Sequence, residues 1–314
     1  MRSTAAGAAL ATTTSLAWGG QFVVGKSALS RVDPFYLTAM RYLVAALVLL
    51  APLVAFEGRR ALRLEGRGLR LLWLGTLGFA AFNLLIYTGL AHAKPQNAAL
   101  ITALGPLLTA LVLWLRRGVR PARSTLALLG VALIGVALVI SGGDPASILR
   151  GSIGWGDALI VGAVLSFVLY SLGAAELRGF SPLRYTALTA SLGWLSIAAA
   201  TLVASISGIE RRPSAEAVWA VTPQLAYITL IGAVVAVLAW NASVGILGPQ
   251  NAVLFGNLIP VTTFAIEIVR GYRPASLELV GASVTIGAVA ASNLLGRRRS
   301  APEAAERPAL AEAA

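Results

Sequence analysis

Apolar runs of about 20 residues recur along the chain and are separated by short polar breaks. A helix of that length and composition crosses a bilayer whose hydrocarbon core is about 30 Å thick. Breaks such as Asp33-Pro34 and Ser181-Pro182 carry turn or helix-start signals. The pattern predicts an all-α integral membrane protein with ten transmembrane helices. The expected segments are 5–28, 34–56, 69–90, 95–115, 124–142, 157–177, 183–207, 220–245, 250–269 and 276–296.

The composition supports a membrane protein over a soluble one. Hydrophobic residues make up 57% of the 314 residues and charged residues only 12%, whereas a soluble domain carries about 25% charged residues. The net charge is +12, but the arginines lie in short clusters between apolar runs and not along one helix face, so we expect no nucleic-acid partner. The chain contains no cysteine, which excludes disulfides, thiol catalysis and cysteine-based metal sites.

The positions of Lys and Arg predict the orientation. With a cytoplasmic N-terminus, the inside segments carry 16 of these residues and the outside segments carry 8. This bias predicts a multi-pass protein of the cell inner (plasma) membrane with both termini in the cytoplasm. The first apolar run continues to Lys26, so it is interpreted as a retained helix and not as a cleaved signal peptide. Residues 299–314 are rich in Ala, Glu and Pro and are expected to form a disordered cytoplasmic tail.

The sequence contains an internal repeat. Residues 95–109 (PQNAALITALGPLLT) and 249–263 (PQNAVLFGNLIPVTT) are identical at eight of fifteen positions, at an offset of 154, and Gly78 and Gly232 keep the same offset. We therefore expect two five-helix repeats, residues 1–147 and 148–298. Five spans per copy is an odd number, so the second copy enters the membrane inverted, an arrangement typical of secondary transporters.

Several short motifs resemble the EamA-type transporters of the drug/metabolite transporter superfamily. They include Trp18-Gly19-Gly20 with Lys26 in the first helix, Pro34 followed by Arg41 in the second, and Gly156-Asp157 at the start of the second copy. The resemblance covers about residues 5–298. Relatives place a Gly-Glu pair after the fourth helix of each copy, whereas this chain has Gly118-Val119 and Gly271-Tyr272; no role for that glutamate is carried over.

The resemblance implies a secondary transporter of small metabolites. Amino acids or related compounds are the expected substrates, export is the expected direction, and the mechanism is alternating access between the two inverted repeats. The transporter would act as a monomer or a homodimer in the lipid bilayer. The alternative is a membrane protein that does not transport, either a scaffold or a lipid-modifying enzyme.

The fourth helix of each copy contains one proline and one asparagine that are candidates for moving parts. Pro106 and Pro260 each remove one backbone hydrogen bond within an apolar helix. They predict either kinked helices that line a cavity or tolerated packing kinks. Asn97 and Asn251 near the start of the same helices are either helix caps or symmetry-related gates.

Two charged residues inside expected spans are candidates for a functional role. Arg41 could bind an anionic group of the substrate, hold a neighbouring helix by hydrogen bonds, or extend to the outer interface. Glu267 is interpreted as the only acidic residue well inside a span, and it either pairs with Arg270 or couples transport to protons.

Polar and aromatic side chains within the spans could form a mostly apolar pathway with a few polar contacts, although packing is an alternative for each of them. The candidates are Trp18, Gln21, Arg41, Asn83, Tyr87, Tyr170, Trp240, Asn241 and Asn257.

Catalytic and cofactor chemistry are not expected. Residues 20–27 fit the P-loop pattern G-x-x-x-x-G-K-S, but they lie within an apolar span without the strand that a P-loop follows, so no ATP site is predicted. The single histidine, His92, has no companion residues for a catalytic set or a metal site. The sequence therefore predicts no enzyme, no cofactor and no metal.

Overall fold

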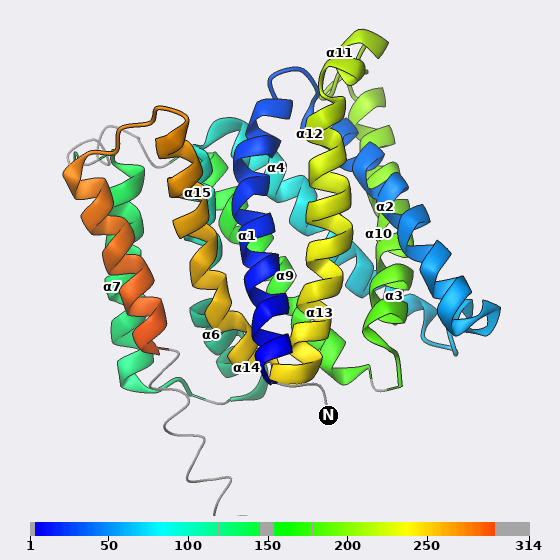
Figure 1. Ribbon diagram of the computed structural model, residues 1–314, viewed down its shortest axis with the longest axis horizontal. Helices are drawn as coiled ribbons and strands as arrows, with labels where there is room; N and C mark the ends of the chain where they lie inside the picture. Colours follow the sequence, from blue (N-terminus) through cyan, green and yellow to red (C-terminus); the bar gives the residue numbers. More distant parts are fainter. Residues whose placement is uncertain (1–3, 119, 143, 145–153, 178, 293–314) are drawn as a thin grey trace, which may run out of the picture. The chain divides into compact units, whose positions relative to one another are not determined.

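The computed structural model describes residues 4–118, 120–142, 144, 154–177 and 179–292. Every regular element in these ranges is helical, and each of the ten expected segments contains a helix (Figure 1). The tail predicted for 299–314 lies outside the described residues.

The helices of the first copy follow the expected segments closely. They are α1 (Thr4–Ala28), α2 (Pro34–Glu57), the 3₁₀ turn η1 (Arg59–Leu62), α3 (Gly68–Gly75), η2 (Thr76–Ala81), α4 (Phe82–His92), α5 (Pro95–Ala103), α6 (Gly105–Arg117) and α7 (Arg123–Ile140).

The helices of the second copy repeat this order. They are α9 (Trp155–Glu176), α10 (Pro182–Ile206), α11 (Ala215–Ala220), α12 (Thr222–Ala226), η3 (Tyr227–Val235), α13 (Ala236–Leu247), α14 (Pro249–Ala252), η4 (Val253–Asn257), α15 (Leu258–Val269) and a last helix at Ser276–Ser292.

Six helices in the described ranges are long and apolar enough to cross a membrane, or seven if α5 and α6 form one broken span. Helix α1, which contains Thr12, Thr13, Thr14 and Ser15, is not among the six. The fold is thus an all-helical membrane protein, and the number of ten spans stays a prediction.

The fourth helix of each copy is interrupted just before its proline. The first interruption lies at Leu104, between α5 and α6, and Pro106 follows in the first turn of α6. In the second copy the backbone tightens into η4 before α15, which contains Pro260. A proline cannot donate a backbone hydrogen bond to the preceding turn, which accounts for an irregular backbone at both places.

The third helix of each copy widens into a π-helix. In the first copy it is η2, between α3 and α4, and in the second it is η3, between α12 and α13. Shifted by 154 residues, the range of η2 falls within that of η3. π-helical turns leave carbonyl groups available for partners outside the helix and occur frequently at functional sites.

The chain divides into two compact units that do not coincide with the sequence repeats. Unit 1 contains Met1–Gly105 and Ile153–Arg273, and unit 2 contains Pro106–Ser152 and Pro274–Ala314. The first copy therefore contributes α6 and α7 to unit 2, whereas the second copy contributes only the Ser276–Ser292 helix.

In unit 2, α7 packs closely on the Ser276–Ser292 helix (Figure 1). A Cβ atom at Gly135 would lie 2.6 Å from the carbonyl oxygen of Gly281, and a Cβ at Gly281 would lie 2.6 Å from that of Gly135. Thr285 Oγ1 donates to the carbonyl of Ala132 at 3.3 Å. Small residues allow membrane helices to approach this closely.

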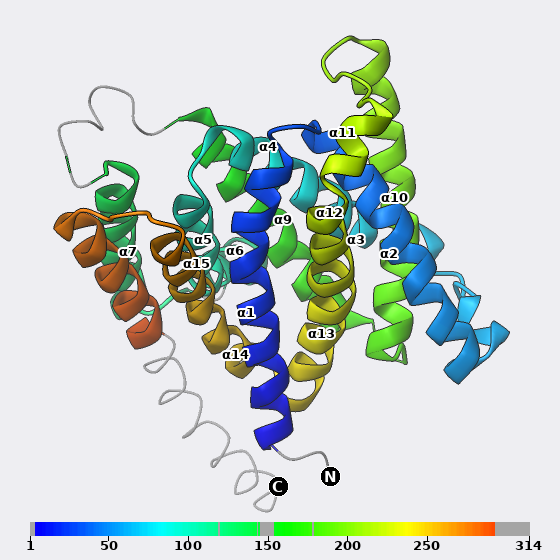
Figure 2. The same ribbon diagram turned by 45° about the horizontal axis from the view of Figure 1, so that its top comes forward.

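In unit 1, contacts between the two copies repeat in matched pairs. Helix α1 packs on η3, α13 and α15 of the second copy, while α9 packs on η2, α4 and α5 of the first. Helices α2 and α10, which are equivalent, pack on each other. Figures 1 and 2 show α1 in the middle of unit 1 with α15 on one side and α12–α13 on the other. Each copy thus completes its core with helices of the other copy.

The equivalent helices α1 and α9 run in opposite directions. Lys26 at the end of α1 donates to the carbonyl of Leu90 at the end of α4, at 2.7 Å. His92, which ends α4, lies with its ring 4.2 Å from that of Trp155 at the start of α9. The end of α1 and the start of α9 therefore lie at the same end of unit 1.

Candidate functional site

A small cavity lies in the middle of unit 1. It is lined by residues from α1, α2, η2, α4, α9, η3 and α13, so both copies contribute to it. Its volume, counted as space for the centre of a water molecule, is about 20 Å³, which is room for about one water. The lining residues are Trp18, Gln21, Arg41, Tyr42, Gly78, Phe79, Phe82, Asn83, Phe167, Gly232 and Val237.

Arg41 of α2 is the one charged residue of this lining, and its side chain is only 1% exposed. Nε donates to the carbonyl of Ile228 at 2.7 Å, and Nη2 donates to Gln21 Oε1 at 2.8 Å. Nη1 donates to Asn83 Oδ1 and to the Tyr87 hydroxyl, both at 3.0 Å. The guanidinium thus joins α1, α2, α4 and η3. The expectation that Arg41 could extend to the outer interface is wrong, because these partners hold it in the interior.

The four acceptors around Arg41 are all electrically neutral. The guanidinium also lies 5.0 Å from the centroid of the Tyr42 ring and 5.5 Å from that of Tyr87, and aromatic rings attract cations only modestly. A guanidinium has five N–H donors, of which four are used. The cavity therefore has a fixed positive charge that no carboxylate among the described residues balances.

The carbonyl groups of η3 accept hydrogen bonds from side chains of the cavity. Ile228 accepts from Arg41, and Gly232 accepts from Trp18 Nε1 at 3.1 Å. In η2, Asn83 Nδ2 donates to the carbonyl of Phe79 at 2.9 Å. The irregular turns of the third helices therefore orient three of the lining side chains.

Two equivalent glycines allow side chains of α1 and α9 to reach the cavity wall. A Cβ atom at Gly232 would collide with Gln21 Oε1, and a Cβ at Gly78 would collide with the ring of Tyr170. Gln21 and Tyr170 are themselves 149 residues apart on the equivalent helices α1 and α9, as are Trp18 and Phe167. The Trp18 and Phe167 rings meet edge to face at 5.8 Å. The cavity is thus built from matched positions of the two copies, but only the first copy places a charge in it.

The structure brings some of the predicted pathway residues together and leaves others aside. Trp18, Gln21, Arg41 and Asn83 line the cavity, and Tyr87 contacts it through Arg41. The Trp240 ring lies 5.5 Å from that of Trp18, and Tyr170 stacks on Tyr185 at 5.2 Å. Asn241 Nδ2 donates to Thr186 Oγ1 at 2.5 Å, and Asn257 lies in η4 with no partner for its Oδ1 among the described residues. Their roles in transport stay predictions.

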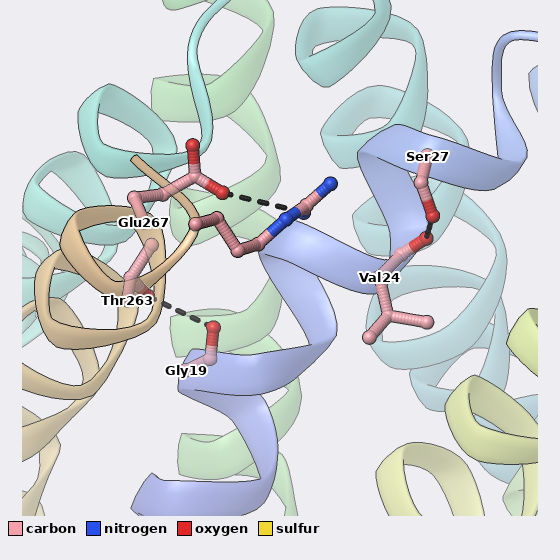
Figure 3. Close-up of polar contacts among 6 residues, drawn as sticks. Gly19, Val24, Ser27, Thr263 and Glu267 are labelled. Carbon is pink, nitrogen blue, oxygen red and sulfur yellow. Dashed lines mark hydrogen bonds and ion pairs between the residues drawn. The ribbon is translucent and has the colours of Figure 1, made fainter. Parts of the chain in front are cut away.

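The predicted gates and the predicted proton-coupling residue lie away from the cavity. Asn97, at the start of α5, is 5% exposed, and Asn251 Nδ2 donates to the carbonyl of Leu247 at 2.7 Å. Glu267 pairs with Arg270 at 3.5 Å. Figure 3 shows Glu267 on the same helix as Thr263, which donates to the carbonyl of Gly19 on α1 at 2.9 Å. Two acidic side chains are more buried than Glu267: Asp157 is 6% exposed and Glu278 is 2% exposed.

The apolar residues and the glycines that line the cavity were not predicted from the sequence. Apolar lining residues cannot be told from core residues along a sequence, because both lie in apolar helices. Gly78 and Gly232 did carry a signal, because both copies keep a glycine at the same place. The missed residues are Tyr42, Gly78, Phe79, Phe82, Phe167, Gly232 and Val237.

Among the described residues, no group of three or more His, Asp or Glu side chains is arranged to hold a metal ion. His92 ends α4 against the ring of Trp155 and has no acidic neighbour in the contacts described for it.

Comparison with known proteins gives consistent results. "Uncharacterized transporter YrdR" of Bacillus subtilis is 29% identical over 300 residues, which cover 93% of this chain and 92% of that one. "Uncharacterized transporter YyaM" of the same organism is 30% identical over 285 residues, 90% of this chain and 92% of that one. A "Probable terminal-alkyne amino-acid exporter" of Streptantibioticus cattleyicolor is 25% identical over 230 residues, 72% of this chain and 74% of that one.

A solved crystal structure has the same fold. It is 21% identical, aligns with a TM-score of 0.65, and covers 94% of this chain and 100% of its own. The model of the EamA-like transporter family matches twice, at residues 5–141 and 154–294. Membrane embedding and a small-molecule substrate follow from this family. The chain belongs to the EamA-like transporter family.

Proposed function

We propose that this protein is a secondary transporter that exports small carboxylate-bearing metabolites, with amino acids as the first candidates. It crosses the plasma membrane ten times with both termini in the cytoplasm. The two five-helix repeats, 1–147 and 148–298, alternate in access around the cavity that Arg41 lines.

The observation that carries the proposal is the unbalanced charge of Arg41. A guanidinium binds a carboxylate through two parallel hydrogen bonds, and these bonds are strong where water is excluded. Arg41 still has one Nη2 hydrogen without an acceptor, and the neutral oxygens of Gln21 and Asn83 can be exchanged for a charged acceptor. A substrate carboxylate would supply the missing negative charge.

The remaining lining fits the rest of an amino acid. Trp18, Phe82 and Phe167 offer apolar and aromatic surface, and pockets that hold small molecules combine such walls with a few polar groups. The relative from Streptantibioticus cattleyicolor is named "Probable terminal-alkyne amino-acid exporter", which supports the same substrate class. A cavity with room for about one water must widen before it accepts a metabolite, and this widening is the step that alternating access supplies.

Purified protein in liposomes tests the proposal. We would load the vesicles with a panel of unlabelled amino acids and measure counterflow of each labelled compound, alongside the corresponding amines without a carboxylate. We expect flux of at least some amino acids and little of their amines. R41Q and R41K should lower amino-acid flux about tenfold or more, since even lysine loses the two-pronged geometry.

R212Q is the matched control, because Arg212 is exposed in the loop after α10, and its flux should equal that of the unchanged protein. Size-exclusion profiles of R41K and R41Q check that both variants fold. Absence of flux for every compound would overturn the transport proposal, and equal flux in R41Q would overturn the role of Arg41.

A further inference from the structure

Asp157 is a buried carboxylate that does not line the cavity. It lies in the first turn of α9, and its Oδ2 accepts from the backbone N–H of Gly154 at 3.0 Å. That bond caps the helix in the manner of a capping box. The other oxygen, Oδ1, is buried and has no hydrogen-bond partner among the described residues.

Among the described residues, helix α5 contains two more buried acceptors without donors, and one of them belongs to a neighbour of Asp157. Helix α5 packs against α9, and Asn97 near the start of α5 lies beside the carboxylate. The oxygens Asn97 Oδ1 and Gln96 Oε1 are buried and also have no partner among the described residues. These two side chains are 5% and 2% exposed.

The cationic and titratable groups on the elements around Asp157 are engaged elsewhere. Lys26 of α1 donates to the carbonyls of Leu90 and Ala91 at 2.7 and 2.9 Å. Lys94, before α5, lies 5.8 Å from the centroid of the Tyr272 ring, and His92 of α4 contacts Trp155. No cation among the described residues balances the charge of Asp157.

An ionised carboxylate without a cation is costly inside a membrane protein, and such a group ordinarily becomes neutral instead. A proton on Oδ1 removes the charge and converts one of the acceptors without a donor into a donor. The capping bond through Oδ2 is compatible with both forms. Glu267 is less suited to this task, because Arg270 already pairs with it at 3.5 Å.

We propose that Asp157 is the proton-carrying group of the transport cycle. The inference rests on the proposed transport function. Oδ1 binds one proton from one side of the membrane and releases it to the other side in each cycle, so one proton enters as one substrate molecule leaves. Phe167, ten residues along the same helix, lines the cavity, about 15 Å away along the axis. Movement of α9 thus connects the proton site to the substrate site.

The matched variants are D157N and E278Q. Asparagine at position 157 keeps an oxygen for the Gly154 cap but cannot carry a proton. Glu278 caps the Ser276–Ser292 helix in the same manner, its Oε2 accepting from the Ala275 N–H at 2.9 Å. E278Q therefore makes the same chemical change at a second buried cap, in unit 2.

Two measurements on the full chain in liposomes separate the steps. The first is exchange of labelled amino acid at equal pH and equal concentration on both sides. The second is accumulation driven by a pH difference across the membrane, with the probe that exchanges best. We expect D157N to exchange within about twofold of the unchanged protein but to lose pH-driven accumulation. D157E should restore part of it, and E278Q should keep both activities.

The outcomes are distinguishable. No exchange by the unchanged protein would refute the proposed function itself. Exchange without a response to the pH difference, or pH-driven accumulation by D157N, would overturn the role of Asp157 and leave the transport function intact. Accumulation driven by a sodium gradient and not by a pH difference would likewise overturn the proton assignment. If D157N fails to exchange, D157E decides the question. Exchange together with partial, pH-driven accumulation by D157E supports the inference, whereas accumulation by D157E that does not depend on the pH difference overturns it.

Discussion

Nη1 of Arg41 lies 3.0 Å from Oδ1 of Asn83, and both side chains are at most 1% exposed. The Asn83 amide is oriented by its own Nδ2, which donates to the carbonyl of Phe79 at 2.9 Å. The cation of the cavity is thus held by a neutral side chain at a position where a carboxylate would fit.

N83D tests whether the missing negative charge matters. The new carboxylate would lie beside the guanidinium and neutralise it, so we expect a folded protein whose amino-acid flux falls about tenfold or more. The cost to stability is about 1 kcal/mol, because Phe79 loses a donor. Liposome flux and the melting temperature measure the two effects. N83D with unchanged flux would show that substrates do not need the free charge of Arg41.

The two glycines of the cavity wall should be intolerant of a methyl group. G232A places a Cβ against Gln21 Oε1, and G78A places one against the ring of Tyr170. Overpacking of this kind costs about 1–3 kcal/mol, so both variants should melt earlier and transport less. G245A is the control: Gly245 of α13 has open space around its Cβ position, and alanine favours a helix by about 1 kcal/mol. Equal melting of G245A and G232A would contradict the packing described for η3.

Ser15 tests the irregular backbone of η4. Its Oγ donates to the carbonyl of Phe255 at 2.7 Å. In a regular helix, that carbonyl would accept from a backbone N–H of its own helix. In a membrane protein an unsatisfied carbonyl is unfavourable, so S15A should lower the free energy of unfolding by about 1 kcal/mol. S27A is the control, because Ser27 Oγ donates to Val24 within its own helix at 2.7 Å (Figure 3). Thermal unfolding in detergent compares them, and a larger loss for S27A would contradict the account.

Glu210 should make the stability of the loop between α10 and α11 depend on pH. Burial, followed by the nearby charge of Asp33, raises the pKa of this carboxyl from 4.5 to about 7. The folded protein therefore favours the protonated form. The stability that this form contributes is complete below pH 4.5 and is lost as the pH rises to about 7.

Protease cleavage of the loop measures this effect. The loop should be cut faster at pH 8 than at pH 5 relative to a peptide substrate, and E210Q should remove the difference. E216Q, at an exposed position in α11, should leave it unchanged. A pH response that persists in E210Q would assign the effect to another group.

The helices could be predicted from the sequence because apolar periods and helix-start signals are local. The expected segment 34–56 corresponds to α2 at Pro34–Glu57, and 183–207 corresponds to α10 at Pro182–Ile206. Prolines 106 and 260 also marked where the fourth helices become irregular, since proline acts on its own turn. The π-helices could not be predicted, because nothing in the composition of residues 76–81 distinguishes them from an ordinary helix.

The site could be predicted only in its polar part. Polar side chains such as Gln21, Arg41 and Asn83 stand out against an apolar background, whereas Phe82 and Phe167 do not. The burial of Arg41 could not be predicted either, because its position two turns into a helix suits both an interior and an interfacial side chain. The burial of Asp157 was not predicted, because Asp157 lies at the start of the expected span 157–177, where a side chain can be either buried or solvated.

The matched contacts of α1 and α9 have a consequence for a copy on its own. Helix α1 finds its neighbours α13 and α15 in the other copy, and α9 finds α4 and α5 there. A polypeptide that ended after α7 would leave those surfaces of α1 facing lipid, with Thr14 and Ser15 deprived of the carbonyls of Ala236 and Phe255. One copy by itself would therefore need a second molecule inserted the other way round to cover these surfaces, and in this chain the covalent link between the copies supplies that partner.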